Sequence, residues 1–360
     1  MKALTLIVAG DPDQLTGGYR YDARVAQGLG AEGWDVDVVG LAGRFPEPDA
    51  VASHALDSAL TALPDGARVV IDGLAMSGLP AIVERHASRL PITALIHHPL
   101  ADETGLDAAQ QQRFRISETR ALAAVERVIV TSVYTAHRLA DFDVPAEKRF
   151  VIEPGVAPSE LATGAGDGVT RLLCVATLTP RKGQDLLVDA LAELTDLPWQ
   201  CELIGGLDRA DAFVADVTAR IERHGLGERI HLLGGVPSES LGAYYRDADL
   251  FVLPSHYEGY GMVITEALAH GLPVVTTTGG ALSHTLPDTA GIKVPPGDVV
   301  ALREALRRML EDAESYRRYR DGARQARDDL NDWTTASAAF ARALDAPLAT
   351  RHAQTSGAKS

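Results

Sequence analysis

Short runs of β-branched and other apolar residues alternate with longer amphipathic segments along most of the chain. In the first half, the apolar runs predict strands at residues 4–9, 35–39, 68–71, 92–96, 127–130 and 149–152. The segments between them predict helices at residues 19–31, 54–63, 79–88 and 106–125. Strands that alternate with helices form βαβ units, so this half predicts a parallel sheet covered by helices on both faces.

The alternation stops at residues 153–168, where glycine and proline are frequent, and then begins again. The second half predicts strands at residues 171–176, 200–204, 229–233, 250–253 and 273–276. It predicts helices at residues 184–194, 212–224, 239–245, 263–270, 299–310 and 313–329. The pattern therefore indicates an α/β protein with two doubly wound parallel sheets of the Rossmann-like kind.

We place an N-terminal domain at residues 1–157, a linker at 158–168 and a C-terminal domain at 169–330. A last helix within residues 331–346 could pack back on the N-terminal domain, and residues 347–360 predict a disordered tail because they lack apolar content. Doubly wound sheets bind ligands outside the carboxyl ends of their strands. We therefore expect two domains that face a central cleft, with the ligand between them.

The 360-residue chain carries 34 basic and 49 acidic side chains, which gives a net charge of −15. Nucleic-acid binding and docking on an anionic membrane both need a basic surface, so we expect neither. No apolar run approaches the roughly 20 residues of a membrane-spanning helix. Cys174 and Cys201 lie in apolar strands, which favours core residues over disulfide partners or metal ligands. We expect a cytoplasmic protein, and the sequence leaves its oligomeric state open.

Two short patterns resemble binding motifs but occur in the wrong context. Gly28, Gly30 and Gly33 fit G-x-G-x-x-G, yet they end a predicted helix and lead into a strand. A dinucleotide site of that type must instead follow a strand and open a helix. Asp247 and Asp249 form a D-x-D that precedes a strand rather than following one, so we expect no metal there.

Residues 254–273 predict a loop, a helix, a glycine stop and a strand in succession. Gly259 and Gly261 in the loop would let the backbone approach a ligand closely. The helix that begins near Met262 would direct free N–H groups and a positive dipole end at that loop, which suits a diphosphate.

Glu258 precedes this helix and Glu266 lies one to two turns into it, so both carboxylates can face the same space. Carboxylates beside an anion site are poor phosphate ligands but good acceptors for hydroxyl groups. The pair therefore points to a ligand that carries both a diphosphate and sugar hydroxyls.

The segment from Glu258 to Glu266 resembles the E-x7-E motif of retaining glycosyltransferases with the GT-B fold, in particular family 4 (glycosyl transferases group 1). Residues 177–183, Thr-Leu-Thr-Pro-Arg-Lys-Gly, are similar to the basic loop that holds the donor diphosphate in this family, which maps onto Arg181 and Lys182. Two cations at a strand end can stabilise a leaving diphosphate without a metal. The resemblance covers essentially the whole chain and is more specific in the second half.

Two further segments of the first half match the family. Residues 16–18, Thr-Gly-Gly, are similar to the glycine-rich loop that closes over the diphosphate and the acceptor, which involves Gly17 and Gly18. Family members carry a histidine at the end of the fourth strand, near the reacting sugar. The spacing favours His98 and leaves His97 open, and since adjacent strand residues face opposite sides we expect one of the two to face the cleft.

The resemblance implies transfer of a hexosyl unit from a UDP- or GDP-linked sugar to an acceptor hydroxyl, with retention and with neither a metal nor another cofactor. The implied catalytic residues are His98, Arg181, Lys182 and Glu258. The implied donor-binding residues are Gly17, Gly18, Arg181, Lys182, Glu258, Gly259, Tyr260, Gly261, Met262, Val263 and Glu266. In these roles the two cations stabilise the leaving diphosphate, Glu258 holds the sugar hydroxyls, Glu266 holds the ribose, and His98 orients the sugar or the acceptor.

Three points stay open at this level. Residues 204–208, Ile-Gly-Gly-Leu-Asp, replace the Gly-Asp-Gly turn that is more usual in the family, so the nucleotide base is undetermined. The alternatives to a transferase are a non-catalytic protein that binds nucleotide sugars, and an epimerase or phosphorylase on the same scaffold. Arginines and glutamates alternate at residues 110–127, where a lipid-linked acceptor would favour a basic amphipathic stripe, so we expect a soluble small molecule or a glycan as the acceptor.

Overall fold

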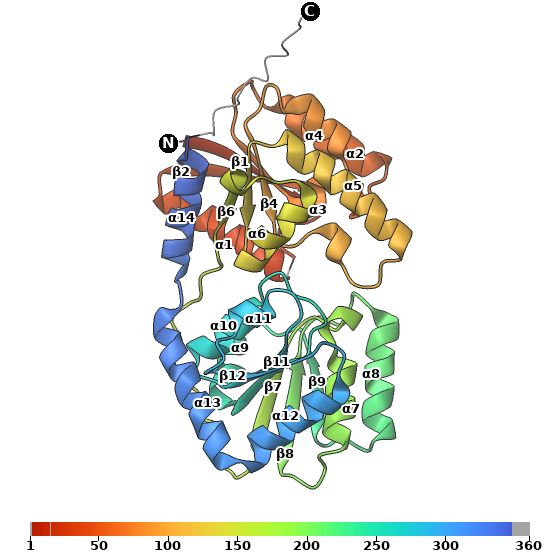
Figure 1. The fold of residues 1–360 in the computed structure, drawn as a ribbon, viewed down its shortest axis with the longest axis vertical. Helices are drawn as coiled ribbons and strands as arrows, with labels where there is room; N and C mark the ends of the chain where they lie inside the picture. Colours follow the sequence, from red (N-terminus) through yellow and green to blue (C-terminus); the bar gives the residue numbers. More distant parts are fainter. Residues whose placement is uncertain (1, 15, 348–360) are drawn as a thin grey trace, which may run out of the picture.

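The computed structural model describes residues 2–14 and 16–347, and it contains two parallel sheets of six strands each (Figure 1). The N-terminal sheet has the strand order β2-β1-β3-β4-β5-β6. Its strands are β1 (Lys2–Ala9), β2 (Trp34–Leu41), β3 (Val69–Asp72), β4 (Ile92–Ile96), β5 (Arg127–Val130) and β6 (Arg149–Val151). The helices around it are α1 (Gly17–Ala31), α2 (Ala50–Ala62), α3 (Gly73–Met76), α4 (Pro80–His86), α5 (Ala108–Ala124) and α6 (Val133–Arg138), with short 3-10 turns η1 (Leu100–Asp102), η2 (Leu139–Phe142) and η3 (Ala146–Lys148).

The C-terminal sheet has the order β12-β11-β10-β7-β8-β9. Its strands are β7 (Thr170–Val175), β8 (Trp199–Ile204), β9 (Ile230–Gly234), β10 (Leu250–Leu253), β11 (Val274–Thr277) and β12 (Gly291–Val294). The helices that follow or cover them are η4 (Pro180–Lys182), α7 (Gln184–Ala192), α8 (Asp211–Arg223), α9 (Ser238–Asp247), α10 (Met262–Ala269), α11 (Leu282–Thr285), α12 (Val299–Glu311), α13 (Ala313–Ala326), η5 (Arg327–Asp329) and α14 (Trp333–Asp345).

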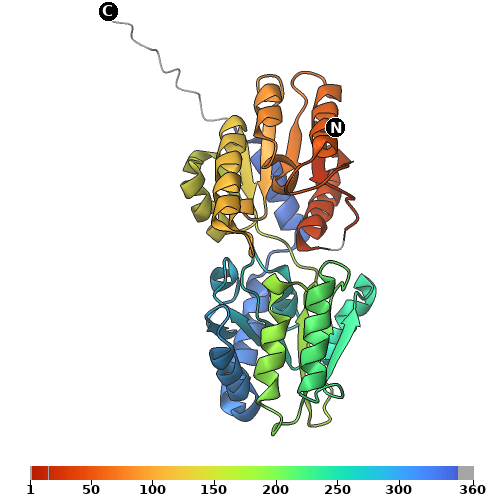
Figure 2. The same cartoon turned by 90° about the vertical axis from the view of Figure 1, so that its right-hand side faces the viewer.

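In each sheet the chain first adds strands on one side and then switches once to the other side. The switch lies between the neighbouring strands β1 and β3 in the first sheet, and between β7 and β10 in the second. Loops that leave such a pair of strands separate to opposite faces of the sheet, so the carboxyl ends of the pair border a natural binding site. The two sheets turn these ends toward each other, and Figure 2 shows the loops of the two domains meeting in the middle of the molecule.

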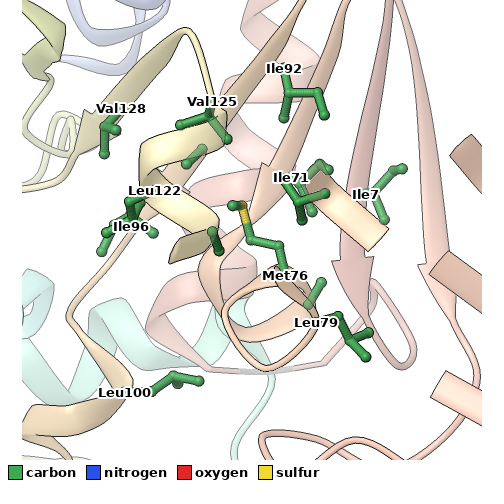
Figure 3. Close-up of a cluster of buried hydrophobic side chains, with 14 of the residues drawn as sticks. Ile7, Ile71, Met76, Leu79, Ile92, Ile96, Leu100, Leu122, Val125 and Val128 are labelled. Carbon is green, nitrogen blue, oxygen red and sulfur yellow. The ribbon is translucent and has the colours of Figure 1, made fainter. Parts of the chain in front are cut away.

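Both faces of the N-terminal sheet are buried, which explains why its central strands are continuously apolar. Alternate residues of β1 enter opposite cores: Ile7 joins one cluster, whereas Leu6 joins the other. Figure 3 shows part of the first cluster, in which Ile71 of β3 lies beside Met76 of α3. The fully buried runs of β3, β4, β10 and β11 therefore give the strongest strand signal in the sequence.

The last helix, α14, leaves the C-terminal domain and packs on α1 of the N-terminal domain (Figure 1). Phe340 and Leu344 of α14 are buried in the same cluster as Tyr21 and Leu29 of α1. The two chain segments that join the domains run side by side, because the Val156 N–H donates a hydrogen bond of 2.8 Å to the carbonyl of Asn331. The domains are thus connected twice.

The expected strands and helices all occur, with ends that differ by a few residues. Gly28 and Gly30 lie inside the last turns of α1, and Gly33 forms the turn before β2, so the G-x-G-x-x-G pattern belongs to the end of a helix as expected. The predicted helix at residues 313–329 ends at Ala326 and continues as the 3-10 turn η5. The sequence reading missed α3, α6, α11 and β12, which are too short to show periodicity.

Cys174 and Cys201 are buried and unpaired, as expected. Within residues 2–14 and 16–347, no helix combines the length and apolar character needed to cross a membrane. Of the predicted tail at residues 347–360, positions 348–360 lie outside the described residues.

Candidate functional site

A buried carboxylate lies between two cations where the C-terminal sheet changes direction. Glu258 follows β10, and its side chain is held 2.5 Å from Lys182 Nζ and 3.2 Å from Arg181 Nη1, both of which follow β7 in η4. The hydroxyl of Ser255 donates a third hydrogen bond to Glu258 at 2.7 Å. The residues that the E-x7-E motif and the basic loop single out therefore contact one another directly.

The electrostatics of this cluster keep the Glu258 carboxylate ionised. Only 7% of the residue is exposed, and burial by itself would raise its pKa. The adjacent charges of Lys182 and Arg181 outweigh this and lower the pKa of Glu258 to about 2. A cation pair preorganised in this way is suited to an anionic ligand that takes over from the carboxylate.

Backbone contacts hold the loop that carries Glu258. Arg181 Nη1 donates to the carbonyl of Tyr257 at 2.8 Å, and the carbonyl of Arg181 accepts the N–H of His256 at the same distance. The carbonyl of Glu258 accepts the N–H of Ala281 at 2.9 Å. The cations, the loop and the start of α11 therefore form one rigid unit.

Helix α10 begins directly after this loop. Its N-cap, Gly261, has a φ of 92°, a left-handed conformation that an L side chain would strain. Tyr260, Met262 and Val263 are each partly exposed at this turn. The first N–H groups of a helix have no carbonyl partner within it and carry a partial positive charge, so they add to the positive field of Arg181 and Lys182.

Glu266 lies further along α10 and is also largely buried. Its Oε2 accepts a hydrogen bond of 2.9 Å from the Tyr245 hydroxyl, and its Oε1 lies 3.4 Å from Nη2 of Arg20 in the N-terminal domain. Burial raises the pKa of Glu266, while Arg20 and Tyr245 act to lower it. The sequence reading placed Glu266 at the site but missed both partners, because each comes from a distant segment.

The two histidines after β4 have different surroundings. Gly17 and Gly18 begin α1, and the His97 ring lies against Gly18, where an added Cβ would stand 3.3 Å from Cδ2 of His97. The His98 ring contacts the Tyr257 ring, and its Nε2 lies 3.1 Å from Glu103. Both residues follow the end of β4, so the alternation of a strand does not force their side chains apart.

His97 contacts two buried aspartates that the sequence reading did not single out. Its Nε2 lies 3.0 Å from Asp22 of α1 and 3.4 Å from Asp72 at the end of β3. The ligand atoms of these three residues lie within 4.8 Å of one another, which would also allow them to hold a metal ion. The sequence held one sign that Asp72 could belong to the site. Asp72 ends the apolar strand β3, which borders the point where the strand order of the N-terminal sheet reverses.

Several contacts join the two domains across this site. Glu103 bridges His98 to Arg181, with its Oε1 3.3 Å from Nε of Arg181. Although burial alone would raise the pKa of Glu103, the hydrogen bond from His98 and the charge of Arg181 lower it to about 2. The site is therefore assembled from both domains, with the cations and Glu258 on one side and Glu103 and the histidines on the other.

Residues 162–326 match the family model described as glycosyl transferases group 1. Among curated proteins, the chain is 26% identical over 267 residues to the MMP alpha-(1->4)-mannosyltransferase of Mycolicibacterium hassiacum, which covers 69% of this chain and 63% of that protein. It is 30% identical over 251 residues to the GDP-mannose-dependent alpha-(1-6)-phosphatidylinositol monomannoside mannosyltransferase of Mycolicibacterium smegmatis, which covers 63% of this chain and 64% of that protein. The match thus spans less than two thirds of the length of either relative.

Among solved structures, the chain is similar to sucrose-phosphate synthase from Thermosynechococcus elongatus, with a TM-score of 0.81 and 22% identity. The superposition covers 95% of this chain and 98% of that one. At this identity the likeness concerns the fold, and it confirms the predicted two-domain GT-B architecture.

Proposed function

We propose that this chain is a glycosyltransferase that moves a hexosyl unit from a nucleoside-diphosphate sugar to an acceptor hydroxyl, because residues 162–326 match the glycosyl transferases group 1 model and the chain has a GT-B fold. The observation that carries the proposal is the position of Glu258 between Lys182 and Arg181 at the start of α10. A diphosphate needs concentrated positive charge, and a sugar needs hydrogen-bond acceptors. Both are present within a few ångströms of each other.

In the proposed reaction, the bond between the anomeric carbon and the diphosphate oxygen breaks, and a bond from that carbon to the acceptor oxygen forms. Arg181, Lys182 and the first N–H groups of α10 stabilise the negative charge that develops on the leaving diphosphate. The acceptor hydroxyl gives its proton to the departing phosphate oxygen on the same face of the sugar. That geometry retains the anomeric configuration and needs no covalent intermediate on the protein.

Glu258 has a second role once the donor is bound. The diphosphate takes over the contacts of Lys182 and Arg181, which frees the Glu258 oxygens to accept hydrogen bonds from sugar hydroxyls. Glu266 accepts hydrogen bonds from the ribose, and Tyr245 fixes the orientation of its carboxylate. His97 or His98 orients the sugar or the acceptor from the opposite domain. Gly17 and Gly18 let the backbone approach the ligand, and Gly259 lets the donor loop approach the His97 backbone.

We also propose that the transfer proceeds without a metal ion. Two cationic side chains and a helix N-terminus together supply the charge that a divalent ion provides in metal-dependent transferases. Turnover that is unchanged by a chelator would support this assignment. Turnover that is lost in the chelator and restored by added Mg²⁺, Mn²⁺ or Zn²⁺ would contradict it.

The donor is the first unknown to resolve. A relative from Mycolicibacterium smegmatis is GDP-mannose-dependent by name, so GDP-mannose is the first candidate, followed by UDP-linked hexoses. A thermal-shift screen of both series identifies the donor that raises the melting temperature most. Incubation with that donor, followed by NMR of the anomeric proton after hydrolysis or transfer, then reports both turnover and stereochemistry.

The expected result is release of the nucleoside diphosphate and a first-formed product with the anomeric configuration of the donor. An inverted product would contradict retention. Binding of a donor without any release of diphosphate, in the presence of mono- and disaccharide acceptors, would indicate the non-catalytic alternative. An absence of both binding and release for every donor tested would refute the proposed function.

A further inference from the structure

One charged side chain lies in the buried stripe of helix α5. The buried residues of this helix are Phe114, Glu118, Ala121 and Leu122. Glu118 is 1% exposed and has no part in the proposed reaction. A buried carboxyl group costs free energy unless its oxygens are paired, so the partners of Glu118 indicate what it does.

Both oxygens of Glu118 accept backbone N–H groups of the 3-10 turn η1. Oε1 accepts from Leu100 at 2.8 Å, and Oε2 accepts from Ala101 at 2.9 Å. The first N–H groups of such a turn have no carbonyl partner within it. Pro99 at the N-cap of η1 offers no side chain that could accept them. Glu118 therefore anchors the start of η1 from a different helix.

The carboxylate form of Glu118 suits these two donors, because each of its oxygens then accepts a hydrogen bond freely. Burial raises the pKa of Glu118 to about 7, although the N–H groups of Ala101 and Leu100 act to lower it. The carboxylate is therefore the main form of Glu118 at pH 8. Binding measured at that pH reports on the anchored turn.

The end of η1 joins the turn to other elements. Asp102 forms an ion pair with Arg138 of α6 through two hydrogen bonds, of 2.7 Å and 2.6 Å. Glu103 follows, and its N–H donates to the carbonyl of Leu100 at 3.1 Å, so its backbone is part of the anchored turn. The carboxylate of Glu103 lies 3.3 Å from Arg181 in the other domain. The turn thus connects a buried helix of the N-terminal domain to a cation of the proposed donor site.

The pair between Glu103 and Arg181 depends on the position of this turn. The Glu103 side chain is 37% exposed, and an exposed ion pair is weak because it must hold two long side chains in one geometry. A turn that is fixed at its start reduces this cost, since the backbone of Glu103 needs no further ordering. A turn that is released at its start increases the cost.

We propose that Glu118 is a positioning residue that, through η1, holds the Glu103 carboxylate on Arg181 and so sets how tightly the donor site binds a nucleoside diphosphate. This inference rests on the proposed function, which assigns the diphosphate to Arg181 and Lys182. Glu103 and the diphosphate are both anions and share Arg181, so a firmly held Glu103 weakens diphosphate binding. The buried carboxylate acts on the donor site of the other domain without touching it.

The test is a double-mutant cycle in the full-length protein, with Glu118→Gln, Glu103→Gln and the variant that carries both substitutions. The side-chain amide of Glu118→Gln has one accepting oxygen, and its NH₂ group would face the second backbone N–H, so one anchor of the turn is lost. Isothermal titration calorimetry at pH 8 measures the dissociation constants of GDP, of UDP and of pyrophosphate, a probe without a base. Glu84→Gln is the matched control, because it removes the same charge from an exposed pair with Arg120 of α5.

Glu118→Gln should bind these diphosphates about two- to fivefold more tightly than the wild type, the range expected when a partly exposed competing pair is lost. In the Glu103→Gln background the same substitution should change the dissociation constants by no more than about 1.5-fold, because the competitor is already absent. A purely structural role of Glu118 would change binding equally in both backgrounds. Glu84→Gln should match the wild type.

Hydrogen exchange followed by mass spectrometry measures the anchoring of the turn without a ligand. Peptides that contain residues 100–103 should exchange faster in Glu118→Gln than in the wild type, whereas peptides from β1 should exchange at the same rate. Glu118→Asp, which keeps the charge on a shorter side chain, takes the place of Glu118→Gln if the latter does not fold. The expected changes then have the same direction.

Equal effects of Glu118→Gln on binding in both backgrounds would overturn the inference. Unchanged binding in Glu118→Gln, weaker binding in Glu103→Gln, or unchanged exchange of residues 100–103 would each overturn it too. Wild-type protein that binds none of the three diphosphates would count against the proposed function. The exchange of residues 100–103 would in that case still decide whether Glu118 anchors the turn.

Discussion

Gly259 of the C-terminal domain lies directly against the backbone of His97 in the N-terminal domain, since a Cβ added to Gly259 would stand 2.2 Å from the carbonyl oxygen of His97. The Thr135 hydroxyl, which also belongs to the N-terminal domain, donates a hydrogen bond of 3.5 Å to the carbonyl of Gly259. Glycine is therefore required here for the approach of the two domains rather than for the fold of either one.

Gly259→Ala should reduce transfer by about tenfold or more, because a displacement of about 1 Å at a reacting centre can cost up to a hundredfold. Each domain should stay folded, and small-angle scattering should report a larger radius of gyration. Gly242→Ala in α9 is the control, since an added Cβ there meets nothing within 4 Å. Wild-type turnover in Gly259→Ala would show that this approach is not needed for the reaction.

Tyr245 offers a test of the role assigned to Glu266. Tyr245→Phe removes the hydrogen bond of 2.9 Å to Glu266 and keeps a ring that stacks on Phe251 and His270. One such bond contributes roughly 1 kcal/mol, so KM for the donor should rise by about three- to tenfold with little change in kcat.

Initial rates over a range of donor concentrations measure this effect. Tyr316→Phe, which loses a bond of 3.1 Å to the carbonyl of Asp249 away from the site, should leave KM unchanged. If Tyr245→Phe lowered kcat and left KM alone, Glu266 would act in the chemical step rather than in donor binding.

Glu103 forms an ion pair with Arg181 in the structure. Its carboxylate would therefore compete with an incoming diphosphate for this arginine. Glu103→Gln removes that competitor, so the free nucleoside diphosphate should bind about two- to fivefold more tightly, the range expected for a partly exposed ion pair. Isothermal titration calorimetry gives the comparison. Glu47→Gln, which removes the same charge from a surface pair with Arg113, controls for the change in net charge. Weaker binding in Glu103→Gln would mean that Glu103 supports the donor site instead.

The parts of the fold that could be predicted are those encoded by continuous segments. Strands β4, β5 and β10 begin and end at the predicted residues because each is an apolar run between polar neighbours. The run of β10 locates the loop that carries Glu258, and the resemblance to the family's basic loop placed Arg181 and Lys182 at the same site before any contact was known.

The parts that could not be predicted depend on contacts between distant segments. Arg20 reaches Glu266 from the other domain, and Asp22 reaches His97 from a different helix. The partners of each pair are far apart in the chain, so no local sequence pattern indicates that they meet. The spacing favoured His98 over the adjacent His97, but it could not show their different partners, because these come from α1 and from the segment after η1.

The ionisation of Glu258 predicts a pH dependence of stability. A carboxyl whose pKa is lower in the folded state stabilises that state above its unfolded pKa, and the contribution is lost as pH falls toward the folded value. For Glu258 these values are 4.5 and about 2, which corresponds to on the order of 3 kcal/mol. Glu258→Gln should therefore be less stable than the wild type at pH 7, and the difference should shrink as pH falls below about 4.5. Urea unfolding between pH 7 and pH 3 measures it, and a difference that stays constant over this range would contradict the assigned ion pair.

The central claim is that Lys182 and its neighbours stabilise a leaving diphosphate. The most direct measurement is the rate of nucleoside-diphosphate release by the wild type, Lys182→Met and Arg303→Met with the donor that the thermal-shift screen identifies. Arg303 pairs with Glu193 on the outside of the C-terminal domain, so its replacement removes an equal charge away from the site. Loss of a preorganised charge at a reaction centre typically costs about a hundredfold or more in kcat. The account predicts that Lys182→Met loses at least that much while it stays folded, and that Arg303→Met keeps the wild-type rate. Equal rates for Lys182→Met and the wild type would contradict it.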